Sequence, residues 1–406
     1  MQSAEGVATG EVASGEVIQD ERPLRILMLF HALNGGAPRS NLTLMQGLRA
    51  RGHEVFAVLP AEQKDPDLEA RIEACASGVT RITVPWCFAT PLGEGTAVTV
   101  KAARQLSSLE KRAQLAAANR EVERLIRDLD IDLVHIGSSV TQMGLAAAKR
   151  AGVPAVWHVR ELPEQQHGLV PYGWTNQAER YAEADAVVCV SHAVAGELGV
   201  DAGNVRVLWD GLPDVAVGER EESRLSTIGT RPLRVAFAGG LSGPKGIQCV
   251  LDAFDGLEAP MELDVFGGCP KLDGEQYRRR IEQTLPNVTY QGFCRDFTDR
   301  LRDYDVLIVA SGFEAFGRVT AEALFRQVLV IGADCGGTPE LLEDGRGILF
   351  TPGDPADMRR ALRTAAEMTP EDYRGTVSAG RAFAEAQLNE QAYLDGMERI
   401  YRDVLA

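Results

Sequence analysis

Short apolar runs alternate with longer helical stretches from residue 24 onward. The first series of runs is rich in β-branched residues, and each run is almost continuously apolar: Arg25–Phe30, His53–Leu59, Val79–Val84, Ile131–Ile136, Pro154–Val159, Ala186–Val190 and Val205–Leu208. Continuous apolar strands separated by helices are typical of a parallel sheet that is covered on both faces. The pattern therefore predicts a doubly wound α/β unit in the first half of the chain.

The pattern breaks at residues 213–232, which are polar and charged and lack clear periodicity, as an interdomain connection does. It then resumes in a second series of runs: Arg234–Ala238, Glu262–Phe266, Val288–Tyr290, Asp305–Ala310 and Val328–Ile331. A chain of 406 residues is long enough for two cores, because single cores stop growing at roughly 250 to 300 residues. We therefore expect two α/β domains, followed by an amphipathic helix from about Asn389 to Ala406.

Composition narrows the classes of function. The net charge of -16 excludes nucleic acid as the main partner, because duplex binding needs a basic footprint. The seven cysteines are scattered and include no C-x-x-C pair, which favours a reduced, cytoplasmic protein without a zinc site or disulfide framework. The N-terminus has no long apolar run, so neither a signal peptide nor a transmembrane helix is expected.

One segment of this acidic chain is basic. Between residues 101 and 127 the bases outnumber the acids: Lys101, Arg104, Lys111, Arg112, Arg120, Arg124 and Arg127. A basic amphipathic helix can contact an anionic membrane or an anionic acceptor. A solvated helix face explains the same pattern. The sequence therefore allows two locations, the cytoplasm alone or the cytoplasm with peripheral contact at the inner membrane face.

Two glutamates, Glu314 and Glu322, stand where the apolar run Asp305–Ala310 gives way to a stretch of helical composition. Glu314 is expected on the loop that leaves the strand, and Glu322 about one turn inside the helix. Ligands of open parallel sheets bind at such loops, and two carboxylates there can accept hydrogen bonds from several hydroxyls. Because the helix N-terminus also favours an anion, the pattern indicates a nucleotide sugar. The alternative is a surface helix with two solvated glutamates.

The segment Glu-Ala-Phe-Gly-Arg-Val-Thr-Ala-Glu, residues 314–322, resembles the E-x7-E signature of the retaining glycosyltransferases of family 4. The resemblance implies the GT-B fold, an α/β fold in which two Rossmann-like, doubly wound domains face each other across a cleft. Glu314 would orient the donor-sugar hydroxyls and Glu322 the ribose hydroxyls. The implied donor-binding residues between them are Ala315, Phe316, Gly317, Arg318 and Val319.

The resemblance also implies a division of the chain. We expect a disordered acidic tail (1–22), an N-terminal acceptor-side domain (23–210), a connection (211–232), a C-terminal nucleotide-sugar-binding domain (233–385) and a terminal helix that packs back on the first domain (386–406).

A glycine loop follows the first predicted strand. Gly35 and Gly36, ahead of a helix with Pro38 in its first turn, can present free amides to a phosphate or to the acceptor, although a plain strand-to-helix turn looks the same. The loop is similar to the family's N-terminal Gly-Gly loop. The resemblance implies that Arg39 belongs with Gly35 and Gly36 to the acceptor and phosphate loop.

A second loop, residues 239–246, is similar to the family's Gly-Arg-Leu...Lys-Gly loop, in which arginine and lysine bind the donor diphosphate. Lys245 is the lysine here, but Gly240 stands at the arginine position. Arg39, Arg160 or Arg318 would have to substitute, or diphosphate binding is weaker. Gly267 belongs to a loop that resembles the one packed against the nucleobase.

Two further motifs are candidates. Thr338 and Pro339 in Gly-Gly-Thr-Pro-Glu, residues 336–340, predict a helix start with Thr338 as the N-cap. His158 and Arg160 end a predicted strand in the family-like order His-x-Arg-Glu. A histidine at a strand end is usually structural. The resemblance instead implies that His158 faces the donor sugar and that Arg160 helps to hold an anion.

These patterns lead to one function. We expect a retaining glycosyltransferase that moves a hexose-type sugar from a UDP- or GDP-sugar to an acceptor hydroxyl, with His158, Glu314 and Lys245 at the reacting centre. No Asp-x-Asp motif in a suitable loop predicts a metal, and no cofactor is implied beyond the nucleotide-sugar co-substrate. The alternative is a GT-B nucleotide-sugar-binding protein that is non-catalytic or differently catalytic, such as an epimerase.

Overall fold

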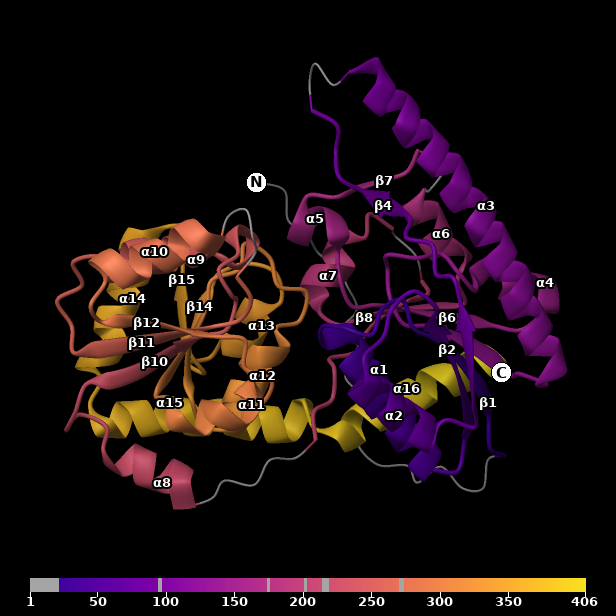
Figure 1. The fold of residues 1–406 in the computed structure, drawn as a ribbon. Helices are drawn as coiled ribbons and strands as arrows, with labels where there is room; N and C mark the ends of the chain where they lie inside the picture. Colours follow the sequence, from indigo (N-terminus) through magenta and orange to yellow (C-terminus); the bar gives the residue numbers. More distant parts are fainter. Residues whose placement is uncertain (1–21, 94–96, 174–175, 201–202, 214–218, 270–273) are drawn as a thin grey trace, which may run out of the picture.

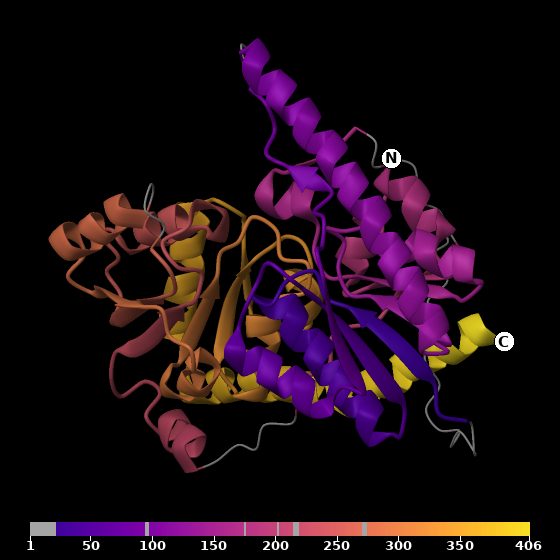
Figure 2. The same cartoon turned by 45° about the vertical axis from the view of Figure 1, so that its right-hand side comes forward.

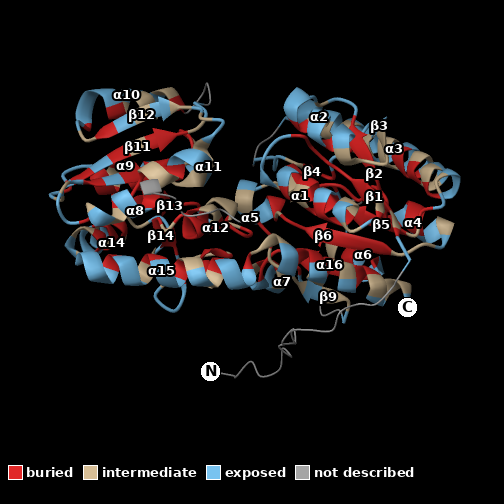
Figure 3. Ribbon diagram, turned by 90° about the horizontal axis from the view of Figure 1, so that it is seen from below, coloured by how far each residue is buried: buried red, intermediate tan, exposed pale blue. Residues whose placement is uncertain are grey.

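The computed structural model describes residues 22–93, 97–173, 176–200, 203–213, 219–269 and 274–406. Apart from Arg22, which pairs with Asp132, the predicted acidic tail lies outside the described residues. Figure 1 shows two α/β units side by side, each built on its own sheet. Figure 3 shows the central strands of both sheets buried and the outer faces of the surrounding helices exposed. The predicted fold class, two parallel, doubly wound α/β domains, is confirmed.

The first domain contains, in the described part of the chain, a seven-stranded parallel sheet with the order β3-β2-β1-β5-β6-β8-β9. Its strands are β1 (Arg25–Leu29), β2 (Glu54–Pro60), β3 (Gly78–Ile82), β5 (Leu133–Ile136), β6 (Ala155–Val159), β8 (Ala186–Cys189) and β9 (Val205–Val207). The two short strands β4 (Phe88–Ala89) and β7 (Val170–Pro171) pair separately and antiparallel. All seven strands of the large sheet coincide with predicted apolar runs. The signal is strongest in β1, β2, β5, β6 and β8, which are almost continuously buried.

Helices cover both faces of this sheet. Its helices are α1 (Gly36–Ala50), α2 (Pro66–Cys75), α3 (Val98–Asp128), α4 (Leu145–Ala151), α5 (Pro163–His167), α6 (Gln177–Glu183) and α7 (His192–Glu197). Buried side chains of α3, α4 and α6 pack with Leu27, Val134 and Trp157 on one face. Those of α1 and α2 pack with Ile26, Met28 and Val156 on the other. The alternation of strand side chains between the two faces produces these two layers.

The second domain has the sheet order β12-β11-β10-β13-β14-β15 in its described residues, the classic order of a dinucleotide-type fold. Its strands are β10 (Leu233–Phe237), β11 (Met261–Phe266), β12 (Val288–Gly292), β13 (Val306–Val309), β14 (Leu329–Ala333) and β15 (Ile348–Phe350). The edge strand β15 was not predicted from the sequence. The remaining five follow the predicted runs.

The helical elements of this domain also form two layers. They are α8 (Glu219–Ser226), η1 (Gly243–Lys245), α9 (Ile247–Phe254), α10 (Gly274–Thr284), α11 (Phe297–Arg300), η2 (Leu301–Asp303), α12 (Arg318–Phe325), α13 (Thr338–Leu342), α14 (Pro355–Glu367) and α15 (Pro370–Gln387). Helix α8 lies in the predicted aperiodic connection. Its Arg224 is buried and donates to Tyr373 Oη (2.9 Å) and to the carbonyl of Gln327 (2.8 Å), which fixes the helix against the second domain.

The last helix, α16 (Glu390–Leu405), crosses from the second domain to the first. Figures 1 and 2 show it continuing from α15 under the first sheet. Tyr393, Met397 and Tyr401 are buried there with residues of β1 and α1. Leu394 packs so closely on α1 that a Cβ at Gly47 would come within 2.3 Å of its Cδ1. The C-terminus is therefore part of the first domain's core.

Candidate functional site

Glu314 and Lys245 meet at the carboxyl edge of the second sheet. Glu314 lies on the loop between β13 and α12, and Lys245 ends η1, which follows β10. Because β10 and β13 are paired neighbours, their loops emerge side by side. Lys245 Nζ is 2.7 Å from Glu314 Oε1, and Ser311 Oγ donates to the same oxygen at 2.5 Å. The lysine side chain is 40% exposed, so a charged pair stands open to a ligand.

Glu322 makes a second such pair one helical turn into α12. Arg318 Nε donates to Glu322 Oε1 at 3.0 Å, and Thr298 Oγ1 donates to Oε2 at 2.8 Å. Arg318 also reaches the first domain, where its guanidinium donates to Ser40 Oγ at 3.1 Å. A Cβ on Gly36 would lie 4.0 Å from Arg318 Cδ. The start of α12 and the start of α1 therefore face each other across the domain junction.

The loop that carries Glu314 is held by the glycines before α13. Gly336 has a φ of +59°, and a Cβ there would come within 2.3 Å of the Glu314 carbonyl oxygen. Gly337 N–H donates to that same oxygen at 2.7 Å. Only glycine permits such close approach of two backbones. The Gly-Gly pair thus fixes the position of Glu314, with the Gly337 amide already used inside the protein.

The predicted N-cap of α13 is wrong. Gly337 is the N-cap, Thr338 is the first helical residue, and no side chain caps the helix. Thr338 is buried, and its methyl group would meet a Cβ placed on Gly332 of β14. The close backbone contact between Gly337 and Glu314 starts the helix one residue earlier than a threonine cap would.

The structure gives a physical reason for the glycine at position 240. Gly240 has a φ of +66°, and a Cβ there would lie 2.8 Å from the Gly268 carbonyl oxygen and 3.0 Å from its nitrogen. Gly240 N–H donates to Phe266 O, and Leu241 N–H to Gly268 O, both at 2.8 Å. The loops after β10 and β11 are therefore joined through their backbones, which brings Gly240 and Gly267 together and leaves no room for an arginine.

The glycine loop of the first domain stands opposite. Gly35 has a φ of +90° and is the N-cap of α1, with no side-chain cap, so the first helical amides have no side-chain acceptor there. Gly36 begins the helix, and Arg39 is exposed on its first turn. A Cβ on Gly36 would be within contact distance of the Arg318 side chain of the second domain. The structure therefore brings this loop to the same junction as the two carboxylates.

His158 and Arg160 lie elsewhere, inside the first domain. The His158 side chain is fully buried on β6, with its ring 5.4 Å from the His135 ring. Its Nδ1 lies 3.2 Å from an Arg160 nitrogen, and burial, together with the Arg160 charge, holds the pKa of His158 well below its usual value. Because the His158 side chain is fully buried, it cannot make the predicted contact with a donor sugar in this structure.

Arg160 is likewise occupied. Its guanidinium forms an ion pair with Asp210 and donates to Tyr393 Oη at 2.7 Å, and its side chain is 2% exposed. Burial opposes its charge, but Asp210 and Tyr393 outweigh that effect and raise the pKa of Arg160. The predicted anion contact of Arg160 is replaced by a structural one, which ties α16 to β6.

Sequence reasoning missed the partners that orient the carboxylates. Ser311, Thr298 and Ser40 come from three separate segments, and only Ser311, three residues before Glu314, carried a local signal. Glu340 was also missed as an interdomain contact. Its carboxylate accepts hydrogen bonds from the His192 amide (3.0 Å), the Ala193 amide (2.7 Å) and Trp209 Nε1 (3.1 Å).

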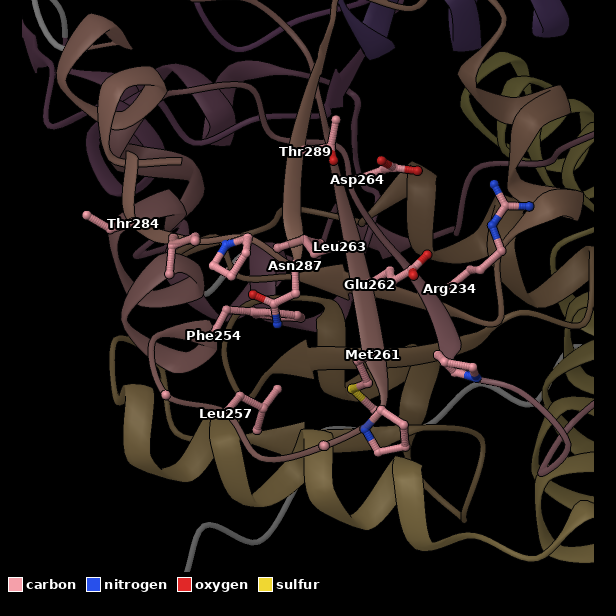
Figure 4. Close-up of a pocket in the computed structure, with 16 residues that line it drawn as sticks. Arg234, Phe254, Leu257, Met261, Glu262, Leu263, Asp264, Thr284, Asn287 and Thr289 are labelled. Carbon is pink, nitrogen blue, oxygen red and sulfur yellow. The ribbon is translucent and has the colours of Figure 1, made fainter. Parts of the chain in front are cut away.

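A groove of about 760 Å³ lies at the opposite end of the second sheet (Figure 4). It is lined at the starts of β10, β11 and β12 by residues that include Arg234, Glu262 and Asn287. Asp264 there accepts from Tyr304 Oη and from Gln291 Nε2, so its oxygens are used within the protein. The residues that line the groove do not include Glu314, Glu322 or Lys245.

Two family models match the chain. The model described as Glycosyltransferase Family 4 matches residues 34–212, and the one described as Glycosyl transferases group 1 matches residues 232–367. Together they cover both domains.

Among curated proteins, an alpha-maltose-1-phosphate synthase of Mycolicibacterium smegmatis is 27% identical in an alignment of 338 residues that covers 72% of this chain and 86% of that protein. A GDP-mannose-dependent alpha-mannosyltransferase of Mycobacterium tuberculosis is 27% identical over 79% of this chain and 81% of its own. Among solved structures, HepE of Anabaena in complex with UDP-glucose superposes with a TM-score of 0.72 at 20% identity, covering 94% of this chain and all of that one.

Proposed function

The chain belongs to the group 1 glycosyltransferases of family 4, which transfer sugars from nucleotide sugars, and from this premise we propose a specific donor site and reaction. The proposed activity is transfer of a hexose-type sugar from a UDP- or GDP-sugar to an acceptor hydroxyl, with retention of the anomeric configuration. The observation that carries the proposal is the Lys245–Glu314 pair at the carboxyl edge of the second sheet.

In this proposal Glu314 orients the hydroxyls of the donor sugar. The Ser311 hydroxyl orients its carboxylate, and the Gly337 amide fixes its backbone carbonyl, before the donor arrives. Lys245 then offers its ammonium to the donor diphosphate, whose charge grows as the sugar departs. A cation placed before the reaction stabilises such developing charge at little reorganisation cost. The ion pair keeps both groups oriented in the free enzyme.

Arg318 is our candidate for the arginine that position 240 cannot hold. Arg160 is buried in its pair with Asp210, whereas Arg318 is partly exposed at the domain junction and reaches both Glu322 and Ser40. A planar guanidinium also suits bidentate contact with phosphate oxygens. When Arg318 turns to the diphosphate, Glu322 becomes available to the ribose hydroxyls. Ala315, Phe316, Gly317 and Val319 would complete the donor pocket, with Gly267 at the nucleobase and Gly35, Gly36 and Arg39 towards the acceptor.

The proposed reaction forms a bond between the acceptor oxygen and the anomeric carbon as the bond from that carbon to the diphosphate oxygen breaks. The acceptor's proton passes to the departing diphosphate, and attack occurs on the leaving-group face. Neither Glu314 nor Glu322 is assigned as a nucleophile. The contribution of the chain is to hold the donor and to balance the charge of the leaving group.

Turnover of a panel of UDP- and GDP-sugars tests the proposal, measured as nucleotide release with and without candidate acceptors. Glu314→Gln and Lys245→Ala are each expected to lower kcat/KM by about 10² to 10³, the usual effect of removing one preorganised charge contact. The matched controls Glu262→Gln and Lys149→Ala change exposed residues away from the junction and should keep wild-type turnover. Near-wild-type turnover by both site variants, with unchanged melting temperatures, would sink the assignment.

The second candidate is a differently catalytic GT-B protein, such as an epimerase that acts on a nucleotide sugar. Its signature would be conversion of the nucleotide sugar to an epimer without release of the nucleotide. The same panel distinguishes the two, because transfer and hydrolysis both release free nucleoside diphosphate. Family membership favours transfer.

A further inference from the structure

The first half of α3 carries an apolar face that is exposed among the described residues. Val98 is 81% exposed, Leu106 69% and Leu109 64%. With Ala102 and Ala113 they recur at intervals of three or four residues, so they lie along one side of the helix. We call these five residues the α3 stripe. Large apolar side chains grouped on one exposed face mark interaction sites more often than chance exposure.

The stripe is not needed to fold the domain. The second half of α3 anchors the helix, because Ala118, Val122 and Ile126 are buried against the first sheet. At about 1.5 Å per residue the 31-residue helix is about 46 Å long, far longer than the strands it packs against. Figures 1 and 2 both show its first half standing clear of the domain beyond β4 and β7.

Two basic side chains lie beside the stripe. Lys101 and Arg112 are exposed and lie eleven residues apart, close to one line along the helix. Arg104 lies on the opposite side of the helix, where it donates to the Thr90 carbonyl and its guanidinium lies over the Tyr172 ring. Glu110 is the one acid between residues 98 and 113 in a chain of net charge -16. The second half differs, because Arg124 pairs with Glu121 and Arg127 with Glu123. The excess of positive charge therefore belongs to the first half of the helix, where Lys101 and Arg112 lie beside the stripe.

The stripe also has a defined place relative to the proposed site. Helix α3 ends where the chain turns to enter β5, so its beginning lies at the carboxyl edge of the first sheet. The loop containing Gly35 and Gly36 leaves β1 at that same edge. A surface that covers the stripe therefore lies on the side of the molecule where the first domain presents its glycine loop.

We propose that the α3 stripe docks onto an anionic lipid bilayer. The apolar side chains would enter the boundary between headgroups and acyl chains, and the flanking bases would contact lipid phosphates, as in interfacial amphipathic helices. In the described residues no helix is long and apolar enough to cross a bilayer, so the contact is in the plane of the membrane surface. Resting on the proposed function, the placement implies an acceptor that is itself lipid-borne.

Vesicle co-sedimentation tests the docking independently of activity. The full chain should bind phosphatidylglycerol-containing vesicles, bind pure phosphatidylcholine weakly, and lose anionic binding as salt is raised. The Leu106→Gln/Leu109→Gln double variant should bind at least about tenfold more weakly, since interfacial binding scales with buried apolar area. Phe293→Gln removes an equally exposed apolar side chain, 76% exposed, from the second domain and should bind as wild type.

Two results would overturn the proposal. One is equal vesicle binding by wild type and the Leu106/Leu109 variant, or no binding by either. The other is a wild-type dimer in light scattering that the variant abolishes, which would make the stripe an interface between two copies. Release of nucleotide from the donor in the absence of vesicles should be the same for wild type and variant, so failure here leaves the proposed function standing.

Discussion

Placing arginine at position 240 restores the residue expected in the diphosphate loop and tests why the chain lacks it. The backbone there is left-handed, with a φ of +66°, which costs a non-glycine residue about 1–2 kcal/mol. A Cβ would also lie 2.8 Å from the Gly268 carbonyl oxygen, which is backbone and cannot swing away. Forcing apart a packed contact of this kind costs about 1–3 kcal/mol.

The two effects together predict that Gly240→Arg destabilises the second domain by about 2–5 kcal/mol. A domain of this size shifts by about 2–4 °C per kcal/mol, so its melting temperature should fall on the order of 10 °C. Thermal unfolding followed by circular dichroism measures the shift. Binding of a nucleotide sugar should weaken rather than improve, because the loops that hold Gly240 and Gly267 must separate.

Gly243→Arg is the matched control. It adds the same side chain to the same loop, but a Cβ there meets nothing within 4 Å and its φ is not positive. This variant should melt within about 2 °C of wild type, as ordinary surface substitutions do. If Gly240→Arg melted like wild type and bound donor more tightly, the steric account of the missing arginine would be refuted.

Three further predictions concern stability. Burial, with a contribution from the Arg160 charge, lowers the pKa of His135 to about 3. Folding stability should therefore be lost as pH falls from about 6.5, by about 2 kcal/mol at pH 5. In thermal melts His135→Gln should flatten this dependence on pH, whereas the exposed His167→Gln should not. Glu340→Ala leaves three N–H donors without their acceptor and should cost about 1–3 kcal/mol in urea unfolding; an unchanged midpoint would contradict the contact's role. Gly47→Ala should cost about 1–3 kcal/mol through its clash with Leu394, and a Leu394→Ala background should remove most of that cost.

The sequence predicted the fold because its signals are local and strong. Buried parallel strands are continuously apolar, and every strand of the two large sheets except β15 was found, with end shifts of at most two residues. The helix in the connection was missed because what stabilises α8 is not its own periodicity. Its Arg224 is paired with Tyr373 and with carbonyls more than a hundred residues away, and no local pattern encodes such a contact.

The candidate site was predictable where one segment carried it. Glu314 on a loop and Glu322 in the following helix are both found as expected. The role expected for His158 needed a side chain exposed at the end of its strand. The apolar pattern locates the end of the strand but does not show which face of the sheet the side chain lies on. It shares a face with Val156, toward α16, and α16 closes over it with Tyr393. That burial depends on a helix more than two hundred residues away.

The central claim is that the Lys245–Glu314 pair belongs to a nucleotide-sugar donor site. Isothermal titration of UDP-glucose and GDP-mannose into wild type and Lys245→Ala tests it most directly, with Lys149→Ala as the control. We predict that wild type binds at least one of these donors, and that Lys245→Ala binds it at least about tenfold more weakly, since a desolvated charge contact contributes more than 1.4 kcal/mol. Equal dissociation constants for wild type and Lys245→Ala would contradict the claim.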